Sequence, residues 1–83
     1  KKIELIGGEI RKIKWIGRKD APDRVVFFKG SWFVELKRPG AKPRPSQTRE
    51  HQRMRTHGVD VYLIDTYEKV DEFVNEIISH IHT

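Results

Sequence analysis

The chain contains no cysteine, so neither a disulfide bridge nor a thiolate zinc site can stabilise it. Its 83 residues suffice for a single domain with a modest core, and a domain of this size is marginally stable by itself. Close packing or a partner subunit must then supply stability, so we expect an oligomer or a piece of a longer chain. Because the chain starts at Lys1 rather than at a methionine, we also expect its first helix to continue upstream.

Long apolar runs are missing as well. No segment approaches the length needed to span a membrane, and no signal peptide is visible. Internal repeats and low-complexity tracts are also absent from the sequence. The lack of cysteine fits a reducing compartment, so we expect a cytoplasmic protein without a membrane partner.

Positive charge is in excess, with a formal net charge of +5 and a sequence pI of about 9.8. Such a balance favours a polyanionic partner, of which nucleic acid is the usual one. The alternative is a solvated cationic surface that keeps a small protein soluble. Several basic residues follow residue 37 and continue through residue 53. We expect them to contact a DNA backbone: Arg38, Lys42, Arg44, Arg49 and Arg53.

The first half of the chain reads as a short helix followed by three strands. Residues 1–6 can form the end of a helix that the glycines at 7 and 8 terminate. A strand is expected at 9–15, and two more at 23–29 and 31–37 are rich in β-branched and aromatic residues. The glycine between these two marks them as a hairpin.

The second half reads as helix, strand and helix. Ser46 is the expected cap of a helix at 47–57, which can act as a crossover to a strand at 60–65. That strand is then expected to run parallel to the second hairpin strand. A continuous apolar stripe at helical spacing follows Thr66, its expected cap. The fold class is therefore α/β, with the order (α)βββαβα and a mixed sheet flanked by helices.

The hairpin carries charges on its apolar strands. Glu35 and Lys37 are two residues apart, so a strand points both to one face. A three-residue loop at 29–31 would place Asp23 opposite Lys37, on the same face, and Val25 opposite Glu35. A two-residue turn would send Asp23 to the other face, because a shift of one residue inverts the facing. If the three charged side chains form one site, the hairpin must therefore contain a three-residue loop or a bulge.

Two carboxylates close together repel each other unless a cation lies between them. A hard divalent cation such as Mg²⁺ fits such oxygen ligands, with Mn²⁺ as a substitute. The cation activates a bound water, and an adjacent lysine can orient that water or stabilise phosphoryl charge. These are the parts of a metal-dependent phosphodiesterase. The competing interpretation is a solvated same-face Glu–Lys pair beside an ordinary turn aspartate.

The ordered set of motifs is more specific than the spacing. The segments "APDR", "VELKRPG" and "RPGAKPRPSQ", followed by "HGVDVYLID", resemble the VRR-NUC family (virus-type replication-repair nucleases) of the PD-(D/E)XK nuclease superfamily. The resemblance covers roughly residues 7 to 75. It implies a restriction-endonuclease-like core and DNA as substrate.

The resemblance also assigns roles to individual residues. Asp23 and Glu35, with the backbone carbonyl of Leu36, would bind the metal, and Lys37 would be the catalytic lysine. Gln47 would lie beside the site from the first turn of its helix. Lys14 on the first strand and Arg24 after the aspartate are candidate phosphate contacts.

Some positions depart from the family pattern. The family often has glycine where this chain has Asp20, which we interpret as an exposed loop acid. It also has a glutamate on its first helix, and Glu4 stands too close to Gly8 to match it, so its counterpart is expected upstream. The histidines show no metal-ligand spacing and are interpreted as structural or exposed: His51, His57, His80 and His82.

The expected function is a Mg²⁺-dependent DNA endonuclease of replication, recombination or repair, in a phage or its bacterial host. Relatives that consist of one domain resemble Holliday-junction resolvases, so branched DNA and a symmetric homodimer are expected. Two alternatives stay open. One is a DNA-binding or assembly module with a weak or inactive site, and the other is the nuclease domain of a larger repair protein.

Overall fold

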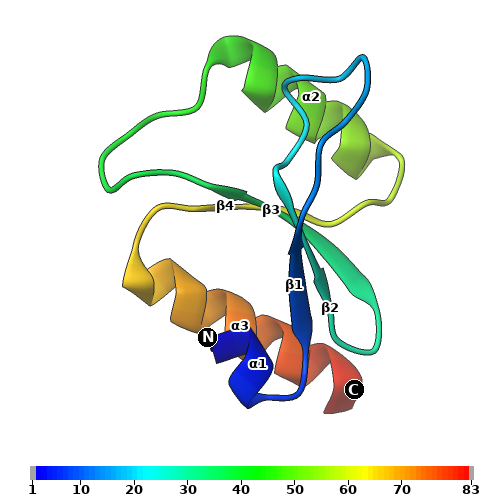
Figure 1. Ribbon diagram of the computed structural model, residues 1–83, viewed down its shortest axis with the longest axis vertical. Coiled ribbons are helices and arrows are strands. Elements are labelled where there is room, and N and C mark those ends of the chain that lie inside the picture. Colours follow the sequence, from blue (N-terminus) through cyan, green and yellow to red (C-terminus); the bar gives the residue numbers. More distant parts are fainter. Residues whose placement is uncertain (1, 83) are drawn as a thin grey trace.

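The computed structural model describes residues 2–82, and the side chains of residues 2–80. Its elements follow the predicted order of helix, three strands, helix, strand and helix (Figure 1). They are α1 (Lys2–Leu5), β1 (Glu9–Lys12), β2 (Arg24–Phe27), β3 (Ser31–Leu36), α2 (Pro45–Thr56), β4 (Val61–Ile64) and α3 (Tyr67–His82).

The four strands form one mixed sheet in the order β1-β2-β3-β4. Strand β2 is antiparallel to both β1 and β3, whereas β3 and β4 are parallel. The chain passes from β3 to β4 through α2, because parallel strands need a crossover connection rather than a tight turn. The predicted mixed sheet and its parallel pair are confirmed.

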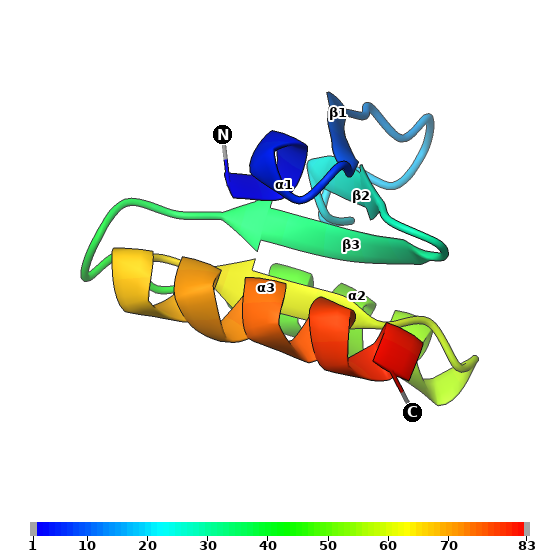
Figure 2. The same cartoon turned by 90° about the horizontal axis from the view of Figure 1, so that it is seen from below.

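The helices divide between the two faces of the sheet. Viewed from below, α3 lies in front of the sheet and α2 behind it (Figure 2). The α3 face holds the main core, where Val26 and Val34 from the sheet pack with Phe73 and Ile77 from α3. Ile3 of α1 belongs to the same core, so α1 also lies on this face. The α2 face buries Val25 and Val61 together with the polar side chain of Glu35.

The closing helix forms as its sequence pattern predicts. The Thr66 hydroxyl oxygen accepts a hydrogen bond from the backbone N–H of Lys69 at 3.1 Å, which confirms the predicted cap. Phe73, Val74 and Ile77 are buried on one stripe of α3. None of the described helices is long and apolar enough to cross a membrane.

Ile77 is fully buried in this core, whereas Ile78 is only partly buried beside it. We expect Ile77→Ala to lower the free energy of unfolding by about 2–5 kcal/mol, because it leaves a cavity that the neighbouring side chains fill only in part. In a domain of this size that loss lowers Tm by at least about 10 °C. Thermal unfolding followed by circular dichroism measures it, with Ile78→Ala as the matched control. Equal losses in the two variants would contradict the described core.

The hairpin has a three-residue loop, but its register differs from the expected one by two residues. Phe27 pairs with Ser31 and Val25 with Phe33, so the loop consists of residues 28–30. Lys29 has a φ of 52°, and a Cβ added to Gly30 would lie 3.1 Å from the Trp32 ring. The ring thus closes over the glycine and fixes where the loop ends. The expected pairings of Val25 with Glu35 and of Asp23 with Lys37 are wrong. A shift of two residues preserves the facing, however.

The first strand is shorter than predicted and stops at Lys12. One more backbone bond follows, from the N–H of Ile13 to the carbonyl of Asp23 at 3.0 Å, before the chain leaves the sheet. The indole N–H of Trp15 then donates to the carbonyl of Pro22 at 2.7 Å and closes the base of the loop. Lys14 is therefore an exposed residue of this loop and does not lie on the strand as expected.

The predicted cap of α2 is also wrong, since the helix begins at Pro45 and Arg44 is its N-cap residue. The backbone N–H of Arg44 donates to Gln47 Oε1 at 3.1 Å. Proline suits the first helical position because it has no N–H that needs a partner there. Ser46 therefore lies inside the first turn.

Candidate active site

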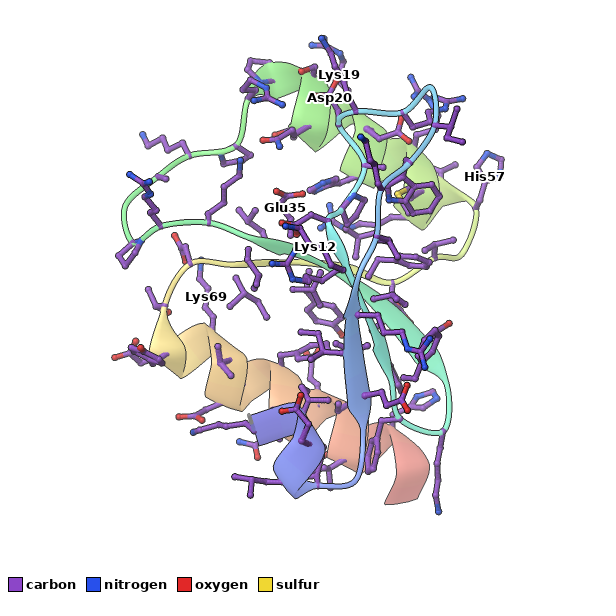
Figure 3. All side chains as sticks on the ribbon, viewed as in Figure 1. Lys12, Lys19, Asp20, Glu35, His57 and Lys69 are labelled. Carbon is purple, nitrogen blue, oxygen red and sulfur yellow. The ribbon has the colours of Figure 1, made fainter. Side chains whose placement is uncertain are left out.

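The predicted trio lies at the end of the hairpin farthest from its loop. Continuing the observed register by one residue places Asp23 opposite Glu35, directly before β2 begins. Glu35 projects from β3 towards α2 (Figure 3). Lys37 follows the end of β3, where its backbone N–H donates to the Ile64 carbonyl of β4 at 2.9 Å. The hairpin thus brings the three predicted side chains to one region of the molecule.

Glu35 is the buried carboxylate of the site, with 7% of its surface exposed. Its Oε2 lies 3.9 Å from Lys37 Nζ, and the lysine side chain is itself mostly buried. Burial raises the pKa of Glu35, the Asp23 carboxylate raises it further, and the Lys37 ammonium partly opposes both. A carboxyl group in this position gains from any additional cation that approaches it.

Asp23 is held by two neighbours. The backbone N–H of Leu36 donates to Asp23 Oδ1 at 3.3 Å, which sets the Leu36 peptide beside the carboxylate. The other oxygen, Oδ2, lies 3.1 Å from Arg24 NH1. Arg24, predicted as a phosphate contact, is therefore an ion-pair partner of Asp23 in this structure. A metal at Asp23 would compete with that arginine.

Helix α2 covers the site with a buried face that includes Gln47 and His51. Gln47 is buried in the first turn of α2, and its Oε1 accepts a hydrogen bond from the backbone N–H of Arg44. Its place beside the site stays a prediction. His51 Nε2 lies 3.9 Å from Glu35 Oε1 and has no hydrogen-bond partner among the described residues. Burial lowers the pKa of His51. His51 was interpreted from the sequence as structural or exposed, although its spacing of four residues from Gln47 already placed both on one helix face.

The donor set can be compared with what a divalent metal requires. Among residues 2–80, no group of three His, Cys, Asp or Glu side chains is already close enough to hold an ion. The ion pair with Arg24 keeps the Asp23 carboxylate engaged. Even so, the carboxylates of Asp23 and Glu35 and the Leu36 peptide lie in one region, and Mg²⁺ and Mn²⁺ bind oxygen donors. The unpartnered Nε2 of His51 lies in the same region. The residues present therefore fit a divalent cation after a local rearrangement of side chains.

Neither acid that departs from the family pattern joins this donor set. Asp20 is half-buried, and its Oδ1 lies 3.1 Å from Arg44 NH2, whose hydrogen bond lowers the pKa of Asp20. The interpretation of Asp20 as an exposed loop acid is wrong, because the pair ties its loop to the start of α2. Glu4 lies on α1, whose core contacts are on the α3 face of the sheet. Glu35 faces α2, so the sheet separates Glu4 from it.

A basic cavity of about 290 Å³ lies between the loop that precedes Asp23 and the exposed side of α2. The residues that line it include Arg18, Lys19, Arg49 and Arg53. Glu50 is buried beneath them, with its Oε1 at 3.2 Å from Arg18 NH1 and 2.5 Å from Arg53 NH1. Sequence reasoning missed Glu50, because a glutamate among arginines on a polar helix gives no signal of burial.

The other predicted DNA contacts are Arg38 and Lys42, which lie in the loop between β3 and α2. Both residues are exposed to solvent. Their role, like that of Lys14, stays a prediction.

The chain was compared with known proteins. No family model matches it. A curated protein named "Putative nuclease p44", from Acyrthosiphon pisum secondary endosymbiont phage 1, is 40% identical over 68 residues, which is 80% of this chain and 73% of that protein. A solved structure described as a VRR_NUC domain superposes with a TM-score of 0.80 at 38% identity and covers 89% of this chain and 83% of its own.

Proposed function

Because the chain belongs to the VRR-NUC family of nucleases, we propose that it is a DNA endonuclease that uses a divalent cation, Mg²⁺ or, as a substitute, Mn²⁺. The observation that carries this proposal is the shared placement of Asp23, Glu35 and Lys37 at one end of the hairpin. The comparisons support a nuclease, and the named residues support the metal-dependent chemistry.

In the proposed mechanism, Asp23, Glu35 and the Leu36 carbonyl would hold the cation. When bound, a divalent cation lowers the pKa of a coordinated water and offsets negative charge on a phosphoryl oxygen. Lys37, held near Glu35 from the same region, orients the attacking water or stabilises the charge that develops on phosphorus oxygens. Gln47 supports this arrangement by fixing the first turn of α2 over the sheet.

The phosphate backbone of DNA is the expected contact of the exposed basic residues around this site. Such contacts give affinity that falls with salt and does not depend on sequence. The proposed contacts are Lys14, Arg24, Arg38, Lys42, Arg44, Arg49 and Arg53. Among them Arg24, Arg44 and Arg53 are already paired with carboxylates, so DNA must exchange with those partners.

We further propose that the substrate is branched DNA and that the protein is a symmetric homodimer. A symmetric homodimer would present two sites and could nick two strands across a branch such as a Holliday junction. The small size of the domain favours a partner subunit. The relative named from a phage supports a role in the cytoplasm of a bacterial host.

The test compares cleavage of a labelled four-way junction, a linear duplex and a single strand, with Mg²⁺, Mn²⁺ or EDTA. We expect cutting that requires the metal and favours the junction. Tight binding without cutting under either metal would instead support a DNA-binding module with an inactive site. The observation that favours this second candidate is the Asp23–Arg24 ion pair, which occupies one of the proposed ligands. Equal cutting of all three substrates would reject the proposed preference for branched DNA and leave the nuclease activity intact.

The Glu50 carboxylate restrains two arginines that could otherwise reach DNA. We expect Glu50→Gln to strengthen binding and to steepen the fall of log K with log salt by about 0.9 for each further DNA phosphate that the freed arginines neutralise. Fluorescence anisotropy with a labelled duplex across a salt series measures this slope. The matched control, Arg49→Gln, should make the slope shallower by about 1. An unchanged slope in Glu50→Gln would mean that Arg18 and Arg53 face away from the DNA.

A further inference from the structure

His51 has an unusual environment for a buried histidine. Its side chain is 4% exposed, and its Nε2 atom has no hydrogen-bond partner among the described residues. That nitrogen lies 3.9 Å from Glu35 Oε1, on the side of Glu35 that faces α2. A buried polar atom without a partner is costly, so one that persists beside a proposed metal ligand requires an explanation.

The hydrogen bonding of the ring indicates which nitrogen carries the proton. Burial lowers the pKa of His51, and a hydrogen bond with the backbone of Asp20 acts in the opposite direction, as it does when a carbonyl accepts from the ring. Because Nε2 has no partner among the described residues, that bond belongs to Nδ1. In the neutral ring the proton then resides on Nδ1, and Nε2 presents a lone pair towards Glu35. This is how a backbone carbonyl fixes the tautomer of a metal-binding histidine.

Two acceptors therefore face each other across a short gap. Bonds to zinc, a divalent cation, are about 2.0–2.1 Å to histidine nitrogen and about 2.0–2.2 Å to carboxylate oxygen. One cation of this kind can thus span up to about 4.3 Å between two donors on opposite sides of it. The observed separation of 3.9 Å lies within this reach, so a small adjustment of the side chains suffices.

We propose that His51 Nε2 is a direct ligand of the divalent cation, together with Glu35 and Asp23. This inference rests on the proposed nuclease function and adds a nitrogen to its oxygen donors. Mg²⁺ strongly prefers oxygen ligands, whereas first-row transition metals accept imidazole. The cation site therefore binds Mn²⁺ more tightly than Mg²⁺, and His51 is responsible for the difference.

The experiment uses the Lys37→Ala protein bound to a DNA duplex, so that substrate stays intact, with Mn²⁺ as the probe. Pulsed electron paramagnetic resonance should show the hyperfine coupling of one directly coordinated ¹⁴N. This coupling should vanish when His51→Gln is added, and Mn²⁺ affinity should fall at least about 10–100-fold. Mg²⁺ affinity, measured by competition, should change much less. The matched control is His57→Gln, an exposed histidine at the far end of α2, which should alter neither quantity (Figure 3).

The outcomes separate this inference from the proposed function. Mn²⁺-dependent cutting by the unmodified protein, with bound Mn²⁺ that shows no nitrogen coupling, would overturn the role of His51 and leave the nuclease intact. Nitrogen coupling without cutting would support the ligand and reject the nuclease. Absence of both Mn²⁺ binding and cutting would reject both. Since the coupling is read before His51 is changed, a folding defect of His51→Gln cannot obscure the answer.

Discussion

We expect Lys37→Ala to lower the single-turnover rate of DNA cleavage by about 10²–10³-fold while DNA affinity changes little. The ammonium lies 3.9 Å from Glu35 Oε2 in a mostly buried position, where it can act on the reacting phosphate and its water. Loss of one preorganised group that stabilises developing charge typically costs a rate factor of this size. Quenched-flow assays with protein in excess over a labelled junction or duplex measure the rate, and anisotropy measures the affinity.

A charge-matched control separates this local effect from the loss of one positive charge. Lys29→Asn removes a lysine at the opposite end of the hairpin, and asparagine tolerates the positive φ of 52° found there. We expect its cleavage rate to stay within about twofold of the unmodified protein, because a distant exposed charge contributes little. A rate in Lys37→Ala equal to that of Lys29→Asn would remove Lys37 from the mechanism.

We expect Glu35→Gln to abolish cleavage and, in the metal-free protein, to stabilise the fold. The carboxylate is buried, and burial followed by the charge of Asp23 raises its pKa. Glutamine has the shape and the neutral charge of the protonated side chain, which is the form that folding favours when the pKa is raised. A gain of about 1 kcal/mol would raise Tm by about 4–8 °C in a domain of this size. Cleavage is lost because glutamine does not supply the charge that holds the cation.

The pH dependence of this gain has a defined sign. Because the folded protein raises the pKa of Glu35, protonation favours folding. That contribution is fully present below the unfolded pKa of about 4.3 and is lost as the pH rises through the folded value. The difference in Tm between Glu35→Gln and the unmodified protein should therefore widen from about pH 4 towards neutrality. Melting curves in EDTA measure it. A difference that narrows over this range would mean that Glu35 is stabilised as an anion.

Excess Mg²⁺ or Mn²⁺ should reverse the order of stability. A cation that binds the folded unmodified protein raises its Tm through mass action, whereas Glu35→Gln gains little. Equal shifts in both proteins would place the metal elsewhere.

The sequence predicted the fold where local patterns determine it. The stripe on α3 and its Thr66 cap need no information from the rest of the chain. The hairpin register does depend on the rest of the chain, because three-residue loops at 28–30 and at 29–31 both fit the residues around Gly30. The choice depends on the Trp32 ring, which packs in the core and covers that glycine. Such packing is set by α3, far along the chain.

The candidate site was predictable in part for a similar reason. Spacing along one strand placed Glu35 and Lys37 together, and a three-residue hairpin loop brought Asp23 to the same face. The family resemblance then assigned a role to each of the three. Glu50 was missed because its burial depends on how the crossover helix lies over the preceding loop. The position of His51 Nε2 opposite Glu35 depends on how the same helix lies over the sheet. Charge and periodicity on α2 alone do not reveal which of its polar residues lose contact with water.

The alternation along β3 has a consequence for how this chain can diversify. Trp32 and Val34 face the α3 core, whereas Glu35, the next residue after Val34, faces α2 and the candidate site. A change at Val34 can be offset by a compensating change in α3, so that position can drift in step with its neighbours. Glu35 has no such freedom, because its partners are set by chemistry. Adjacent positions of one short strand are therefore expected to tolerate different substitutions.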